Sequence, residues 1–182
     1  MDIINQEQII NQTKKWIIDV VVGCNFCPFA AKEVKKNSIY YTVETSKDIA
    51  DALTKLMREF NRLDEDENIE TSFVILPNGF NDFNEYLHLT DLVNKLIKKE
   101  KYEGIYQVAS FHPNYCFAGS NELDAANYTN RSIYPMLHIL REESIEKALE
   151  KYPDPDNIPT RNIDFAQNKG LAYMKMLRDA CL

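Results

Sequence analysis

The sequence is poor in glycine and histidine, and it lacks the short motifs that identify many enzymes. It contains five glycines and three histidines among 182 residues. No P-loop, G-x-G-x-x-G, G-x-S-x-G or H-E-x-x-H pattern occurs in it. The sequence therefore gives no support to a glycine-rich phosphate-binding loop, a hydrolase nucleophile elbow or a zinc-protease helix.

An excess of basic residues is also missing. The chain carries 21 lysines and arginines against 28 aspartates and glutamates, a net charge of −7. Binding along a phosphate backbone depends on basic patches, and no tract here interleaves lysine or arginine with aromatic residues. We therefore expect no nucleic-acid partner, and the acidic surface favours solubility.

Long hydrophobic runs are absent as well. No apolar stretch is long enough to span a bilayer, so we expect no membrane partner. The N-terminal residues do not combine a basic start with an apolar run, as a signal peptide would. These features predict a cytoplasmic protein in which the four cysteines are mostly reduced.

What the sequence does have is ample material for a core. Hydrophobic residues make up 45% of the chain, which suits one domain over residues 1–182 without a disulfide or metal to staple it. Segments rich in β-branched and aromatic residues predict four strands, over residues 38–44, 71–76, 105–111 and 133–140. Helical patterns surround them, which gives an α/β fold in the order α-β-α-β-α-β-β-α-α.

The order of elements predicts a mixed four-stranded sheet. Strands that alternate with helices favour parallel pairing through right-handed crossovers, so the first three strands are expected to be parallel. The fourth follows the third without a helix and is expected to run antiparallel. Pro135 lies inside this fourth segment and cannot donate to a ladder, which predicts an edge strand or a bulge. Ligands are expected at the carboxyl ends of the parallel strands, near 77–80 and 111–115.

The first candidate site is the pair Cys24 and Cys27. A C-x-x-C pair is typical of a redox dithiol or half of a zinc site. Zinc needs two more ligands and no second C-x-x-C occurs, so this pair predicts no metal site, and the sequence predicts no cofactor. Pro28 suits the start of a short helix that ends near residue 35, which would place Cys27 at its cap and favour a thiolate. The alternative is that Cys27 simply fills space in the core.

The second candidate site is the segment that ends the third strand. His112 is followed by Pro113 and, shortly after, by Tyr115. A histidine in a loop at the end of a strand is typical of functional sites, because its charge can change near neutral pH. The alternative is a histidine whose ring nitrogens bind the backbone of a turn.

The third candidate site is a polar stretch around the fourth strand. Its members are Asn127, Asn130, Arg131, His138, Arg141 and Glu142. Arginine offers a planar pair of donors and asparagine adds neutral ones, a combination that suits a carboxylate or phosphate. The alternatives are turn-forming asparagines, a buried hydrogen-bonded imidazole at His138 and an Arg141–Glu142 pair at a helix start.

Three sequence blocks together resemble a known family. The blocks are GCNFCPFA at 23–30, ASFHPNYCFAG at 109–119 and NYTNRSIYPMLHILRE at 127–142. They resemble an uncharacterised bacterial family catalogued as a domain of unknown function (DUF1415), and the resemblance covers nearly the whole chain. The family pattern has an aliphatic residue where this chain has Cys24, which leaves Cys27 as a single thiol. The resemblance implies no known activity. The positions that the resemblance implicates are Cys27, Pro28, His112, Pro113, Asn127, Asn130, Arg131, His138, Arg141 and Glu142.

These observations lead to three functional hypotheses. The first is an enzyme for a small anionic substrate, and the second is a non-catalytic binding or regulatory module that uses the same pocket. The third is a mononuclear metal site built from His112, His138 and either a thiol or Glu142. For the enzyme, the predicted catalytic residues are Cys27, His112, His138 and Glu142, and the predicted ligand-binding residues are Asn127, Asn130, Arg131, Arg141 and Tyr115. The same hypothesis predicts that Arg131→Ala abolishes binding and leaves the fold intact.

Overall fold

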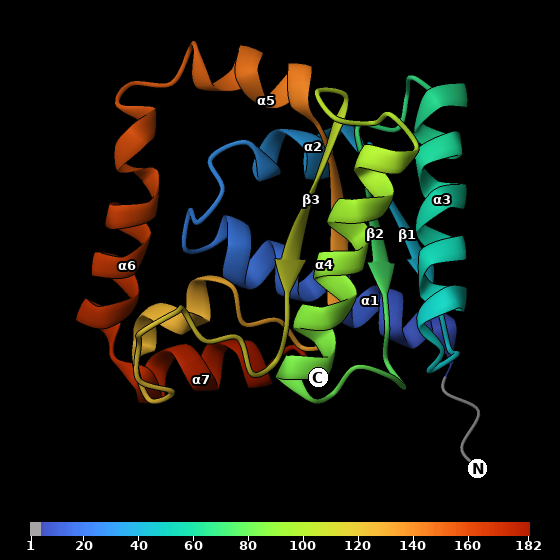
Figure 1. The fold of residues 1–182 in the computed structure, drawn as a ribbon. Coiled ribbons are helices and arrows are strands. Elements are labelled where there is room, and N and C mark those ends of the chain that lie inside the picture. The colour runs from blue at the N-terminus through green and yellow to red at the C-terminus, as the bar shows by residue number, and fades with distance from the viewer. Residues whose placement is uncertain (1–4) are drawn as a thin grey trace.

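The structure is a computed structural model that describes residues 5–182, so the first four residues of the predicted domain lie outside it. Its strands form one sheet in the order β1-β2-β4-β3 (Figure 1). They are β1 (Ile39–Val43), β2 (Thr71–Ile75), β3 (Tyr106–Phe111) and β4 (Met136–Arg141). β1 and β2 are parallel, and β4 is antiparallel to both of its neighbours. The predicted mixed four-stranded sheet is therefore confirmed.

The predicted edge position of the fourth strand is wrong. β4 lies between β2 and β3, so β3 runs in the direction of β2 but pairs only with β4. The strand begins at Met136, and Pro135 lies just outside the ladder, where its missing N–H is not needed. The carbonyl oxygen of Pro135 still accepts a hydrogen bond of 2.9 Å from the Leu76 N–H. A proline that only begins a strand is compatible with the centre of a sheet.

Two long helices cover one face of the sheet. α3 (Ile49–Glu65) connects β1 to β2, and α4 (Phe83–Lys99) connects β2 to β3. Each is preceded by an N-cap aspartate, Asp48 or Asp82, whose side chain accepts hydrogen bonds from the backbone of the first turn. Their apolar faces bury Leu56, Phe60 and Tyr86, among others, against β2 and β4. This layer forms one of the two hydrophobic cores of the fold.

The opposite face of the sheet is covered by the N-terminal part of the chain. α1 (Gln6–Trp16) continues into a π-helix, η1 (Ile17–Val22), and α2 (Ala30–Lys36) follows. A Cβ atom at Gly23 would lie 2.2 Å from the carbonyl oxygen of Asp19, so only glycine allows the backbone to close this wide turn. Trp16, Ile17 and Val20 pack from this layer onto the sheet.

The C-terminal part follows β4 as three helices. α5 (Glu142–Leu149) leads through a short 3-10 turn, η3 (Pro155–Asn157), to α6 (Ile158–Lys169) and α7 (Leu171–Asp179). The predicted order has two helices after the fourth strand, but Gly170, with a left-handed φ of 82°, divides the second into α6 and α7. α6 and α7 pack against the 3-10 turn η2 (Ala125–Thr129) between β3 and β4. Within residues 5–182, no helix has both the length and the apolarity needed to cross a membrane.

Candidate functional site

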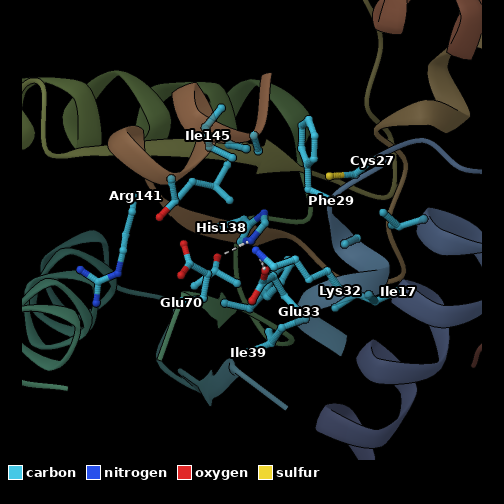
Figure 2. Close-up of a pocket in the computed structure, with 18 of the residues that line it drawn as sticks. Ile17, Cys27, Phe29, Lys32, Glu33, Ile39, Glu70, His138, Arg141 and Ile145 are labelled. Carbon is cyan, nitrogen blue, oxygen red and sulfur yellow. Dashed lines mark hydrogen bonds and ion pairs between the residues drawn. The ribbon is translucent and has the colours of Figure 1, made fainter. Parts of the chain in front are cut away.

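A pocket of about 440 Å³ lies on the η1 side of the sheet, beneath α5 (Figure 2). All four strands contribute to its floor, and η1, α2 and α5 form its walls. Because Glu70 and Thr71 line it, it reaches the amino end of β2, and of the two segments where the sequence predicted ligands, 77–80 and 111–115, only Phe111 lines it. The apolar floor residues are Ile39, Phe73, Ala109, Phe111 and Leu140.

His138 lies in the pocket floor because β4 is an inner strand. Its ring stacks on Phe73, with ring centres 3.9 Å apart and planes inclined by 8°. Its Nε2 lies 2.6 Å from the Thr71 hydroxyl oxygen, the contact drawn in Figure 2. These contacts match the hydrogen-bonded imidazole that the sequence analysis names as the alternative, and they leave the ring facing the cavity.

The neighbours of His138 determine its tautomer. The Thr71 hydroxyl has one proton, and the carbonyl oxygen of Ile139, 2.5 Å away, can only accept it. The Thr71 oxygen must then accept from His138, so Nε2 carries the ring proton. Burial lowers the pKa of His138 to about 3, so the ring is neutral at neutral pH and Nδ1 keeps a lone pair. No described residue hydrogen-bonds Nδ1, which makes it the free acceptor of the pocket floor.

Cys27 lines the same pocket. All four cysteines are free. Burial raises the pKa of the Cys27 thiol, and hydrogen bonds from the backbone of Phe29 and Ala30 lower it by less. The sequence placed Cys27 at the helix cap, but the cap residue of α2 is Phe29. The helix start does act on the thiol as predicted, yet desolvation outweighs it and favours the neutral form.

We therefore expect Cys27 to react slowly with iodoacetamide at pH 7.5. Alkylation requires the thiolate, and a raised pKa reduces the thiolate fraction. Peptide mass spectrometry should show a rate for Cys27 in the folded protein well below its rate in urea. The rate in the folded protein should keep rising above pH 9. Equal rates in the folded and unfolded chains would restore the activated thiol that the sequence predicted.

Arg141 and Glu142 follow His138 at the end of β4. The Arg141 Nη2 donates to the carbonyl oxygens of Leu63 and Ile69, at 2.6 and 3.0 Å. These carbonyls belong to the end of α3 and the segment after it, so Arg141 ties α3 to the sheet although it also lines the pocket. Glu142 begins α5 and does not line the pocket, and no ion pair joins it to Arg141.

His112 is fully buried away from this pocket. Its Nε2 lies 2.8 Å from the carbonyl oxygen of Phe80, and its Nδ1 accepts a hydrogen bond of 3.0 Å from the Asn114 N–H. The ring packs against Phe83 and Tyr86 of α4. Both nitrogens are thus used by the backbone, as in the alternative reading, and burial lowers the pKa of His112.

Arg131 and Asn127 hold the loop between β3 and η2. The Arg131 Nε and Nη2 donate to the carbonyl oxygens of Tyr115 and Glu122, at 2.8 and 2.9 Å. Asn127 is fully buried, and its side chain accepts from the Phe117 N–H at 3.0 Å. The Nε and Nη2 donors of Arg131 and the amide donor of Asn127, which the sequence assigned to an anion, are thus directed to the protein's own backbone.

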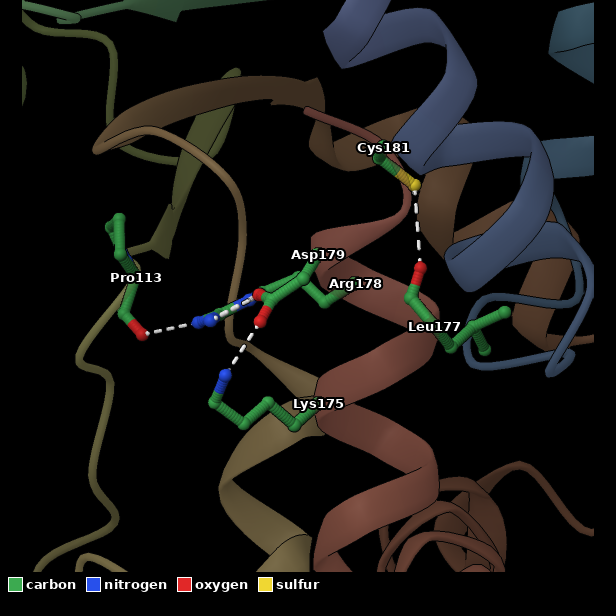
Figure 3. A network of polar contacts seen from close by, with 6 residues as sticks. All are labelled: Pro113, Lys175, Leu177, Arg178, Asp179 and Cys181. Atoms are coloured by element: carbon green, nitrogen blue, oxygen red, sulfur yellow. Dashed lines mark hydrogen bonds and ion pairs between the residues drawn. The ribbon is translucent and has the colours of Figure 1, made fainter.

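Asn130 and Tyr115 belong to the same loop region. The His112 N–H donates to the carbonyl oxygen of Asn130 at 3.3 Å, so the end of β3 does meet the start of β4 as predicted. Burial raises the pKa of Tyr115, and a hydrogen bond with the Asn130 side chain opposes it. Arg178 of α7 donates to the Pro113 carbonyl oxygen at 3.0 Å and closes this structural cluster (Figure 3).

Apart from Glu142, the predicted site residues thus fall into two groups. Cys27, His138 and Arg141 line the pocket, whereas the residues around His112 and Arg131 form a network that satisfies backbone groups. Sequence reasoning missed Thr71, which fixes the His138 tautomer, and Phe73, on which the ring stacks. Neither has a local signal, because each becomes a neighbour of His138 only when β2 pairs with β4.

The described part of the chain contains no cluster of potential metal ligands. Within residues 5–182, no group of three or more histidines, cysteines, aspartates or glutamates is placed to hold an ion. His112 packs on the α4 side of the sheet, and His138 faces the η1 side. The two histidines of the metal hypothesis therefore lie on opposite faces.

Comparison with known proteins places the chain in a family without describing an activity. No curated protein and no solved structure matches the chain. A family model described as "Protein of unknown function (DUF1415)" matches residues 8–176. This match covers nearly the whole chain and includes the three blocks that suggested the resemblance. The chain belongs to the DUF1415 family.

Proposed function

We propose that the protein binds a small molecule with an apolar body in the pocket beneath α5, and that His138 accepts a hydrogen bond from it. The observation that carries this proposal is the free Nδ1 of a neutral imidazole in the floor of an apolar cavity. A volume of about 440 Å³ is within the range of small-molecule sites. Apolar walls with few well-placed polar groups are typical of such sites.

A binding role has more support than a catalytic role. A nucleophilic Cys27 would need a thiolate, and burial favours the thiol. His138 has its pKa lowered to about 3, far from the value that suits a general base at neutral pH. The anionic site first considered around Arg131 has its Nε and Nη2 donors engaged by carbonyl oxygens. The non-catalytic module is therefore the hypothesis that the geometry supports best.

The test fills the pocket by one substitution. Ala30 and Ala31 are neighbours on α2, but Ala30 lines the cavity and Ala31 is exposed. Ala30→Phe should therefore weaken binding of neutral 1-anilinonaphthalene by about tenfold or more, because the new ring occupies the cavity. Ala31→Phe should leave the affinity unchanged. Fluorescence titration measures both, and circular dichroism melting checks that each variant folds. Failure of the wild-type protein to bind the probe, or equal binding by both variants, would refute the proposal.

A further inference from the structure

We infer that the ligand of this pocket is an amphipathic anion whose acidic group lies at the mouth between α2 and α5, with its apolar body inside. This inference rests on the proposed function and adds the charge and orientation of the ligand. Three features carry it: the charged residues of the pocket mouth, the engaged state of Arg141, and the lone pair of His138.

The pocket has a local excess of basic residues in an acidic protein. Four basic and two acidic residues line it, while the whole chain has a net charge of −7. Lys32 belongs to α2, Lys147 belongs to α5, and Lys151 follows α5. These three lysines are exposed, so they mark the mouth of the pocket from two of its walls. An anion at the mouth is attracted by this local charge.

The mouth lysines are available to a ligand. Lys32 lies 3.3 Å from Glu33, with 68% of its side chain exposed, and Lys147 pairs with Glu143 at a similarly exposed position. Exposed ion pairs of this kind contribute little, so a ligand can compete for either lysine. Glu33 already accepts a hydrogen bond of 2.7 Å from the Ser38 hydroxyl. Figure 2 shows Lys32 and Glu33 on the α2 side of the cavity.

The interior of the pocket excludes the acidic group. Arg141 is the basic residue next to the sheet, and its guanidinium donates to carbonyl oxygens at the end of α3 and beyond it. The free nitrogen of His138 presents a lone pair, which repels a carboxylate and accepts from a hydroxyl or N–H group. An anion therefore binds with its charged group toward the mouth. A hydroxyl or N–H group at its inner end can donate a hydrogen bond to His138.

Glu70 allows a second test, in which the affinity for an anion should change in the opposite direction. It lines the pocket, is half-buried, and forms no ion pair with a described residue. Its carboxylate opposes an anionic ligand, so removal of its charge should strengthen anion binding. The lysines and Glu70 thus predict opposite effects on the same measurement.

The experiment compares two probes with one scaffold, neutral 1-anilinonaphthalene and its 8-sulfonate. Replacement of Lys32, Lys147 and Lys151 by glutamine should raise the dissociation constant of the sulfonate about tenfold and leave that of the neutral probe unchanged. The matched control replaces Lys35, Lys36 and Lys95, three exposed lysines that do not line the pocket, and changes the total charge equally. The control should bind both probes as the wild type does.

Three further measurements sharpen the result. Glu70→Gln should lower the dissociation constant of the sulfonate about threefold, because one repulsive charge is removed. A rise in NaCl from about 0.05 to about 0.5 M should weaken the sulfonate and not the neutral probe. Competition by 1-naphthoate and by decanoate then tells whether the natural body is aromatic or aliphatic, and displacement by either supports an amphipathic anion.

The outcomes separate this inference from the proposed function. If the neutral probe binds but the two triple lysine variants change the dissociation constant of the sulfonate equally, the anionic ligand is refuted and the pocket proposal stands. If neither probe binds the wild-type protein, the proposed function fails and this inference fails with it. The inference is supported if the sulfonate binds more weakly to the Lys32, Lys147 and Lys151 variant but not to the control variant, provided that the two variants have the same melting temperature.

Discussion

Replacement of Arg131 by alanine is expected to lower the free energy of unfolding by about 2 to 3 kcal/mol. Two of its nitrogens donate to the carbonyl oxygens of Tyr115 and Glu122, and its guanidinium lies 4.9 Å from the centre of the Tyr128 ring. The variant removes charged donors from both carbonyls and packing from the ring. Because those carbonyls belong to the loop between β3 and η2, the loss unties that loop from the start of β4.

Urea unfolding followed by circular dichroism measures this effect. Arg58→Ala is the matched control, because Arg58 is exposed on α3 and has no ion pair among the described residues. The control should stay within about 0.5 kcal/mol of the wild type. The sequence predicted that Arg131→Ala abolishes ligand binding and leaves the fold intact. If the wild type binds inorganic phosphate and the variant keeps wild-type stability but no longer binds it, that result would favour the earlier interpretation over the structural role.

The fold was readable from the sequence wherever a local pattern decided it. The segment 71–76 was predicted as a strand, and β2 lies within it with every residue buried. The position of β4 was not readable, because Pro135 looked like an interior residue of a strand. The strand in fact begins one residue later. Strand order depends on which elements pack against one another, and a single sequence does not record that.

The candidate site was also predicted only in part. The sequence marked Cys27, His138 and Arg141 as residues of interest, and the structure gathers them around one pocket. It also marked Arg131 and His112, whose polar side chains serve the backbone of an irregular loop. A loop that binds a ligand and a loop that satisfies buried backbone groups contain the same types of polar residue. Only the hydrogen-bond partners distinguish the two cases.

Acidification from pH 7 to pH 5 is expected to lower the free energy of unfolding by about 2 kcal/mol through His138 alone. Burial lowers its pKa in the folded protein to about 3, whereas the unfolded chain has the ordinary value of 6.5. Between these values the unfolded state binds a proton that the folded state does not. The contribution of His138 to stability is therefore fully present above pH 6.5 and is lost as the pH falls toward 3.

Urea unfolding of the wild type and of His138→Phe at pH 7, 6 and 5 isolates this contribution. Phenylalanine keeps a ring that can stack on Phe73 and cannot titrate. His112 acts in the same direction, because burial also lowers its pKa, so the expected effect is the difference between the two proteins. His88→Gln serves as the control, since His88 is exposed on α4. An equal loss of stability in wild type and His138→Phe would contradict a buried, neutral His138.

The same low pKa predicts how ligand binding responds to pH. As long as the protein stays folded, the His138 ring remains neutral down to about pH 3 and Nδ1 remains an acceptor. The affinity for neutral 1-anilinonaphthalene should thus be the same at pH 5 and pH 7 when only the folded fraction is counted. A fall in affinity with a midpoint near pH 6.5 would mean that the imidazole protonates in the folded protein. The free lone pair would then be absent just below neutral pH, and the pocket floor would present a donor to its ligand instead.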